Sequence, residues 1–269
     1  MRNIFRHLFI SVALTVSAMS YCNAANTRAT EQQDTLQHLD TTVIVTKTDS
    51  LKLYKPIFYG GIGLCCGCGE NPPMSFNHVF VAAAAYTKSY NWTKFNHNLI
   101  AGPHIDSEYH EGYNCEANSG AFYYVEASRR WDFVYRGYRE TLRDLDGKGS
   151  GFSQVMLVFN GSVCKIHKVA KPDSKRLRRA ICDIDNELYI IDSKHPMTMP
   201  AFAALLKNAG AFHALYMDMG SMCFSAYKEH FEADWTEIHP RNARSRYATN
   251  YLVFYYVDSL LSGEIFTIK

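Results

Sequence analysis

Apolar runs separated by short polar breaks are clearest between residues 178 and 221. Two such runs, at 180–184 and 188–191, flank a short polar turn, and this arrangement predicts a β-hairpin. Helical spacing follows the hairpin. Thr198 can cap the start of a helix, and the apolar residues that follow recur on one helical face. Gly210 supplies the signal for the end of this helix. The stretch is therefore predicted to pack as one unit of hairpin, helix and a further strand.

The remaining apolar runs predict mostly strands. β-Branched, apolar or aromatic residues are concentrated at 41–46, 78–86, 121–125, 131–135, 155–159, 162–167, 214–217 and 251–256. The Gly- and Cys-rich stretch 59–73 is predicted to be an irregular loop, and residues 138–145 have helical character. Because strands and helices are both predicted, we expect an α+β fold, with a mixed or antiparallel sheet and packed helices in a single domain.

The first 24 residues have the pattern of a secretory signal peptide. Arg2 and Arg6 precede a short apolar run, and Cys22-Asn23-Ala24 offers small residues for cleavage. The apolar run is too short to span a bilayer. The sequence therefore predicts an exported protein, secreted or periplasmic, that is not membrane-spanning. Polar residues 25–40 are expected to form a flexible lead-in, and the domain is expected to occupy residues 41–269.

The net charge of the chain argues against nucleic acid as a partner. The chain has 28 Lys and Arg against 26 Asp and Glu, a formal net charge of +2 at pH 7. Loss of Arg2 and Arg6 with the signal peptide would leave the mature chain formally neutral. Proteins that bind nucleic acid neutralise many phosphates with a basic surplus. No nucleic acid partner is therefore predicted.

Cysteines are the first candidates for chemistry. The chain has eight, and the seven that follow Cys22 are an odd number, so at least one thiol would be free or paired between chains. Cys65-Cys66-Gly67-Cys68 could hold a soft metal, but no second Cys-x-x-Cys pair completes a zinc site, so disulfides or structural thiols are favoured. Cys164 and Cys182 are predicted to lie on neighbouring strands, close enough to bridge.

A polar stretch near the middle of the chain offers metal ligands. His104, Asp106, Glu108 and His110 alternate, so a single extended strand would place all four on one face. Two imidazoles and two carboxylates form a candidate site for a divalent metal. Turn signals on both sides of the stretch leave a solvated loop or edge strand as the alternative. No other cofactor is implied.

Motifs in the latter half of the chain resemble those of the phosphodiester glycosidase family. Residues 178–182 read Arg-Arg-Ala-Ile-Cys, residues 213–221 read His-Ala-Leu-Tyr-Met-Asp-Met-Gly-Ser, and residues 246–250 read Arg-Tyr-Ala-Thr-Asn. Family members carry Arg-Thr-Ala-Ile-Gly, then Asn-Ala-Leu-Asn-Leu-Asp-Gly-Gly-Gly-Ser, then Arg-x-Val-x-Asn. Residues 154–161 are also similar to a family segment. The family includes the enzyme that uncovers mannose 6-phosphate by removing N-acetylglucosamine from a phosphodiester.

The resemblance implies a site for a saccharide or sugar phosphate. It implies catalytic roles for Asp218, Arg178 and Arg246, in which guanidinium groups clamp a phosphate. The residues implied for substrate binding are Ser221, Gly220, Asn250 and Arg179. An arginine near Asp218 is expected to lower the pKa of its carboxyl group, which suits a base better than an acid. Glycoside cleavage normally needs a second carboxylate, and the candidates are Asp183, Asp185, Glu108 and Glu229.

Two departures from the family pattern keep a second function open. The family has Ala-x-Asn-Gly-Gly-Phe-Phe where residues 83–86 read Ala-Ala-Ala-Tyr, and Met219 stands for a glycine of the Asp-Gly-Gly-Gly-Ser turn. Both changes add side-chain atoms where backbone would approach a ligand closely. The two functions are a hydrolase of sugar phosphodiesters and a catalytically inactive relative that acts as a carbohydrate or envelope binding or scaffolding module.

Overall fold

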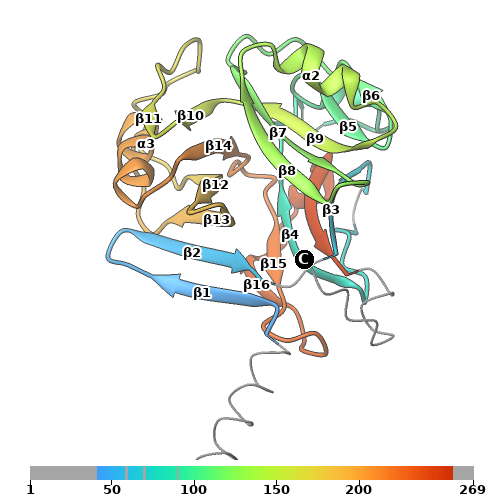
Figure 1. Cartoon of the computed structure of the whole chain (residues 1–269). Coiled ribbons are helices and arrows are strands. Elements are labelled where there is room, and N and C mark those ends of the chain that lie inside the picture. Colours follow the sequence, from blue (N-terminus) through green and yellow to red (C-terminus); the bar gives the residue numbers. More distant parts are fainter. Residues whose placement is uncertain (1–40, 58–59, 69–70, 90, 257–269) are drawn as a thin grey trace, which may run out of the picture. The chain divides into compact units, whose positions relative to one another are not determined.

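Three antiparallel β-sheets form the framework of the residues that the computed structural model describes, which are 41–57, 60–68, 71–89 and 91–256 (Figure 1). All three sheets belong to the unit Thr42–Lys269. They are named here by one strand each, as the β12, β17 and β7 sheets.

The seven-stranded β12 sheet contains the hairpin predicted from the sequence. Its strands, in spatial order, are β1 (Val43–Lys47), β2 (Leu51–Pro56), β13 (Glu187–Ser193), β12 (Arg179–Ile184), β14 (His213–Met217), β10 (Met156–Phe159) and β11 (Ser162–Val163). The helix α3 (Met199–Asn208) follows its N-cap Thr198, whose side chain accepts a hydrogen bond of 3.2 Å from the N–H of Ala201. The predicted hairpin, helix and following strand are thus confirmed.

The other two sheets have five strands each. The β17 sheet has the order β16 (Thr236–His239), β15 (Ser225–Tyr227), β4 (His78–Ala83), β17 (Asn250–Tyr255) and β3 (Gly61–Cys66). The β7 sheet has the order β6 (Tyr109–His110), β5 (His104–Asp106), β9 (Gly149–Gln154), β7 (Gly120–Val125) and β8 (Arg130–Tyr135). The helix α2 (Tyr138–Asp144) packs Leu142 against this sheet. Two 3-10 helices, η1 (His97–Leu99) and η2 (Ser245–Tyr247), lie in connections.

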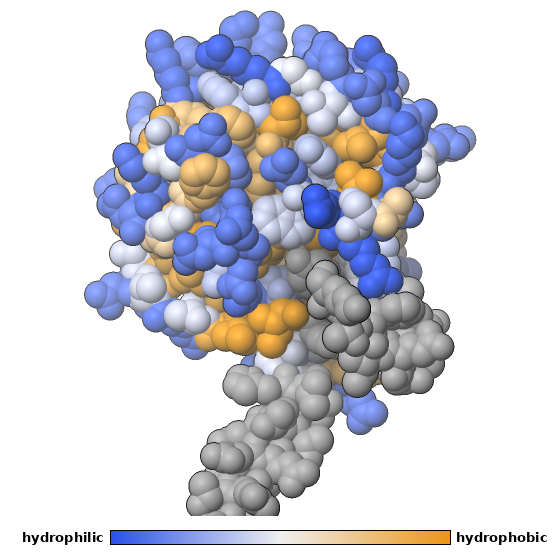
Figure 2. Space-filling view, viewed as in Figure 1, coloured by the Kyte–Doolittle hydropathy of each residue, from blue (hydrophilic) through white to orange (hydrophobic). Residues whose placement is uncertain are grey.

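The main core lies among the three sheets. Ile181 of the β12 sheet, Phe80 of the β17 sheet and Phe122 of the β7 sheet belong to one buried cluster. Because successive side chains of a strand point to opposite faces, the neighbours of Ile181 leave this core. Ala180 and Cys182 pack instead in the cluster that includes the apolar face of α3. Hydrophilic residues cover much of the face seen in Figure 2, with hydrophobic ones among them.

No helix within the described ranges is long and apolar enough to cross a bilayer.

The predicted α+β class with packed helices is wrong, because the described residues are mainly β. Their α-helices are α2 and α3, and every pair of named strands is antiparallel. Strands formed where the local pattern predicted none. β3 lies in the stretch expected to be a loop, and Gly-rich β9 pairs with a strand on each side. A Cβ at Gly149 would lie 2.0 Å from the carbonyl oxygen of Tyr124. Glycine is therefore required there by close strand packing, a constraint that β-propensity cannot reveal.

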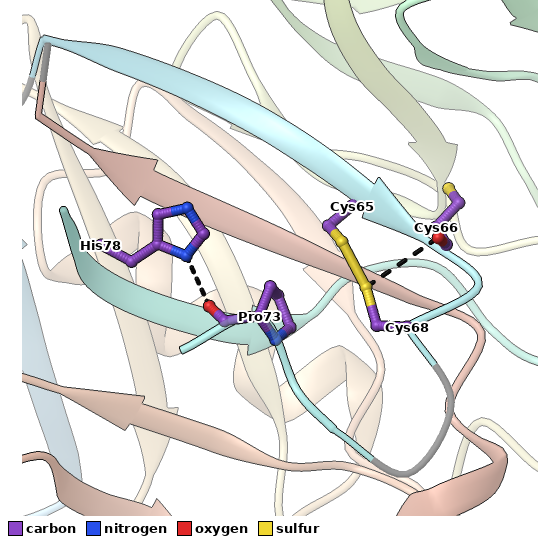
Figure 3. The surroundings of a disulfide bond; sticks show 5 residues. All are labelled: Cys65, Cys66, Cys68, Pro73 and His78. Carbon is purple, nitrogen blue, oxygen red and sulfur yellow. Dashed lines mark hydrogen bonds between the residues drawn. A yellow bond between two sulfur atoms is a disulfide. The ribbon is translucent and has the colours of Figure 1, made fainter. Parts of the chain in front are cut away.

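One of the two predictions about cysteine pairs is confirmed and the other is wrong. Cys65 and Cys68 form a disulfide, the use favoured over metal binding (Figure 3). Cys164 and Cys182 are free thiols. The predicted bridge between these two is wrong, because β14 and β10 lie between β12, which carries Cys182, and β11, which Cys164 follows.

Candidate functional site

A cavity of about 380 Å³ lies at the end of β14. Asp218, Gly220 and Ser221, which follow β14, line it together with Arg178, which precedes β12. The antiparallel pairing of β12 with β14 brings the start of one strand beside the end of the other, because Arg179 pairs with Met217. Sheet register therefore places four of the seven residues implied by the family resemblance around one cavity.

Two hydrogen bonds hold Asp218 at the cavity, one through its backbone N–H and one through its side chain. Its N–H donates to the carbonyl of Ala84 (2.8 Å), and its Oδ1 accepts from the N–H of Gly220 (2.8 Å). The side-chain bond is the ordinary one of an Asp that starts a turn. Burial raises the pKa of Asp218 to about 6, against the opposite effects of the Gly220 N–H and the charge of Arg179. The expectation of a lowered pKa is thus wrong, because desolvation outweighs the nearby cation.

Arg178 is a buried cation held by neutral acceptors. Its side chain donates to the carbonyl of Met197 (3.2 Å), the carbonyl of Ser174 (2.7 Å) and the hydroxyl of Tyr216 (3.4 Å). Only 4% of the residue is exposed, and none of the ion pairs between described residues includes it. A buried charge without a charged partner is costly. Arg178 therefore offers its positive charge to an anion in the cavity.

Several polar residues that were not among the predicted catalytic or binding residues also line the cavity. They are Tyr86, Tyr113, Lys171, Arg176 and Tyr216. The rings of Tyr86 and Tyr216 lie with centroids 5.6 Å apart, and burial raises the pKa of both hydroxyls, so they remain protonated donors. In an extended segment, residues two apart point to the same side, and this pattern could have identified two of these residues. Tyr216 lies two residues before Asp218, and Arg176 lies two residues before Arg178.

The other three residues implied by the resemblance do not line the cavity. Arg246 is exposed in η2, where it donates to the hydroxyl of Tyr247 (2.9 Å). Asn250 is buried and bonds both backbone groups of Ala85 (2.7 and 3.0 Å), so it fixes the segment before Tyr86. Arg179 is buried on the other side of β12 from Arg178, since adjacent strand residues point to opposite faces.

None of the four candidate second carboxylates lines the cavity. Asp183 lines a different cavity, of about 470 Å³, with Asp132 and His213. Asp185 lies in the turn of the β12–β13 hairpin, and Glu108 and Glu229 are exposed. Asp218 is thus the only carboxylate among the described residues that line this cavity.

The predicted metal ligands lie on a hairpin rather than on one strand. Ser107 has φ 116°, and the chain turns there, so β5 pairs with β6 and His104 lies opposite His110. Asp106 and His110 group with His97, whereas Glu108 is exposed in the turn. The four-residue site is therefore wrong at Glu108 and omits His97. His104 belongs to a neighbouring group with Cys66 and His97.

Comparison with known proteins shows similarity in structure alone. No protein-family model matches the chain, and no curated protein matches it in sequence. The catalytic domain of zebrafish N-acetylglucosamine-1-phosphodiester alpha-N-acetylglucosaminidase, auto-inhibited by its pro-peptide, superposes with a TM-score of 0.52 at 12% identity. The match covers 80% of this chain and 81% of that one.

A hypothetical protein from Synechocystis matches with a TM-score of 0.44 at 12% identity, over 80% of this chain and 61% of that one. At 12% identity the zebrafish match establishes the fold alone. The chemistry has to be inferred from the residues of the site. The chain has the fold of the catalytic domain of the zebrafish phosphodiester glycosidase.

Proposed function

We propose that the protein is an exported phosphodiester glycosidase-like protein that binds a sugar phosphodiester in the cavity of Arg178 and Asp218 and hydrolyses it. The observation that carries the proposal is the buried Arg178 guanidinium, which lines the cavity without a carboxylate partner among the described residues. Lys171 and Arg176 add two more cationic side chains to the lining. A guanidinium group and two further cations suit a phosphate.

The saccharide half of the ligand would contact the tyrosines. Aromatic rings with a hydroxyl group offer an apolar face to a sugar ring and a donor to its oxygens. Tyr86 and Tyr216 have this arrangement in the cavity lining, with Tyr113 as a third ring. Cations and tyrosines in one cavity therefore fit a ligand that is part sugar and part phosphate.

Hydrolysis would break the bond between the anomeric carbon and the phosphate oxygen. A water molecule attacks the carbon and gives a proton to ionised Asp218, and the phosphate departs as a monoester. A phosphomonoester is a weak base, with a second pKa of about 6, so it needs little protonation to leave. Arg178 would stabilise the charge that develops on it. This division of roles requires a single carboxylate at the cavity.

The first expected result concerns Arg178. Arg178→Ala should weaken binding of an N-acetylglucosamine phosphodiester by roughly 10- to 100-fold, because it removes a charge-assisted contact. Calorimetry with the purified protein measures this loss. Binding of neutral N-acetylglucosamine should change much less. Arg129→Ala, which alters an exposed arginine in the lining of the other cavity, is the matched control. An equal loss for the neutral sugar would assign Arg178 a structural role.

The second expected result is the pH dependence of sugar release. Asp218 must be ionised to accept the proton, and its pKa is about 6. The value of kcat/KM should therefore fall as the pH drops through about 6. Asp218→Asn should abolish release while keeping ligand binding. If the wild type binds the diester through Arg178 but releases no sugar, the protein is the inactive binding relative. Met219 and Tyr86 in the cavity lining are the feature that favours that outcome.

A further inference from the structure

Five side chains with metal-binding atoms meet away from the cavity, and they are called here the Cys66 cluster. Cys66 ends β3, His97 begins η1, His104 and Asp106 lie on β5, and His110 lies on β6. These elements belong to two different sheets and a connection between them. None of the five residues lines the cavity of Asp218. The cluster therefore needs an explanation separate from the proposed hydrolysis.

Three residues of the cluster lie at the distances of a metal site. The ligand atoms of Cys66, His97 and His104 all lie within 4.8 Å of one another. His97 Nδ1 and His104 Nε2 are 3.0 Å apart. Two nitrogens bound to one tetrahedral zinc ion at 2.0–2.1 Å lie about 3.4 Å from each other. A shift of a few tenths of an ångström would therefore admit an ion between them.

His104 is oriented as a ligand by its other nitrogen. The residue is fully buried, and its Nδ1 lies 3.0 Å from the carbonyl oxygen of Gly102. A carbonyl only accepts, so Nδ1 carries the proton and the lone pair of Nε2 points to His97. Metal-binding histidines commonly donate their second N–H to a carbonyl in this way.

Asp106 and His110 complete the surroundings. Asp106 lies beside the thiol of Cys66 and groups with His97 and His110. His110 Nε2 is 3.1 Å from Asp106 Oδ1, which fixes the carboxylate. The rings of His97 and His110 are stacked face to face, with centroids 3.4 Å apart and an angle of 7°. Aromatic rings avoid this arrangement without a compensating interaction.

Cys66 is available because its neighbours pair with each other. Cys65 and Cys68 form the disulfide, and Cys66 is a free thiol whose sulfur points away from that bond (Figure 3). Adjacent residues of a strand point to opposite faces, so β3 presents Cys65 on one side and Cys66 on the other. The single remaining thiol of the segment therefore faces the histidines.

We propose that Cys66, His97 and His104 bind one Zn²⁺ ion, with Asp106 as the fourth ligand. One sulfur, two imidazole nitrogens and one carboxylate oxygen suit tetrahedral zinc better than calcium or magnesium, which prefer oxygen alone. Four protein ligands make a closed site, which is typical of a structural ion. The ion would tie β3 of the β17 sheet to β5 of the β7 sheet.

The test measures metal binding and does not depend on enzymatic activity. Metal-stripped protein, with its disulfide intact, is titrated with zinc and analysed by elemental mass spectrometry. We expect one ion per chain and a higher melting temperature with zinc. Cobalt substituted for zinc should give a thiolate-to-metal charge-transfer band in the near ultraviolet. Cys66→Ser should remove that band and lower zinc affinity by about 100-fold or more.

Further variants separate the proposed ligands from their neighbours. His97→Ala changes a half-buried residue and should weaken zinc binding even if variants of the buried His104 fold poorly. Cys164→Ser, at a partly buried free thiol elsewhere, and Glu108→Gln, in the hairpin turn, should leave binding unchanged. The double variant Cys65→Ser/Cys68→Ser should also retain the ion. The proposal would be overturned if the wild-type protein took up no zinc. It would also be overturned if Cys66→Ser and His97→Ala each bound zinc as tightly as the wild type.

Discussion

Replacing Arg179 by methionine should lower the free energy of unfolding by about 3–5 kcal/mol. Arg179 is fully buried, and its Nε and Nη2 each donate to one oxygen of Asp192, both at 2.7 Å. Asp192 is only 4% exposed, so the substitution would leave a buried carboxylate without its guanidinium partner. Methionine is similar in length, so little of the loss would come from an empty space. Urea unfolding measures the change.

The double variant Arg179→Met/Asp192→Leu should recover most of that loss. A buried ion pair repays its own desolvation only when every polar atom is satisfied. The Nη1 atom of Arg179 has no hydrogen-bond partner among the described residues, so this pair is incompletely satisfied. Arg129→Ala, at an exposed site, controls for the loss of an arginine as such. A cost below about 1 kcal/mol for Arg179→Met would show that water or another group satisfies Asp192.

The Asp218→Asn variant should be more stable than the wild type at neutral pH, by on the order of 3 kcal/mol. The carboxyl pKa is about 6 in the folded protein, against about 3.9 in an unfolded chain. Between these values the folded state binds more protons, so stability falls as the pH rises from about 4 to 6. Above that range the full cost of the buried charge persists. Asparagine carries no charge, and its amide oxygen can still accept the bond from Gly220.

Unfolding curves at pH values of about 4 and 8 test the sign of this effect. The difference between Asp218→Asn and the wild type should be small at the lower pH and large at the higher one. Asp185→Asn is the matched control, because Asp185 is exposed in a hairpin turn with φ 55°, which asparagine tolerates well. If Asp218→Asn is less stable than the wild type at pH 8, cations around Asp218 outweigh its burial.

The sequence predicted the fold best where local signals agreed. The hairpin of β12 and β13, the cap of α3 and the strand β14 each had a turn, a cap or an apolar run as their signal, and all three formed. β3 and β9 were missed because their pairing, and not their composition, makes them strands. Contacts between distant segments leave no local pattern, so the balance of strand and helix was wrong.

Part of the predicted site was misplaced for a related reason. Arg178 and Asp218 were found through the resemblance, and antiparallel pairing brought them to one cavity. Arg246 matched by sequence position alone, and the structure places it on the exposed η2. The direction of the Asp218 pKa depends on how deeply the fold buries it, which no local pattern states. His97 was overlooked because it lies on a different element from the alternating ligands.

The pairing of Arg179 with Asp192 also distinguishes correct from slipped hairpins. The two residues lie directly opposite each other in the register of β12 and β13. A one-residue slip of β12 that placed Ala180 opposite Asp192 would send Arg179 outward and turn Arg178 into the core, because side chains alternate between faces. Such an isomer would bury one guanidinium without a carboxylate and strand Asp192 without a cation. The ion pair therefore discriminates against this slipped arrangement, which would remove Arg178 from the cavity, even if it adds little net stability.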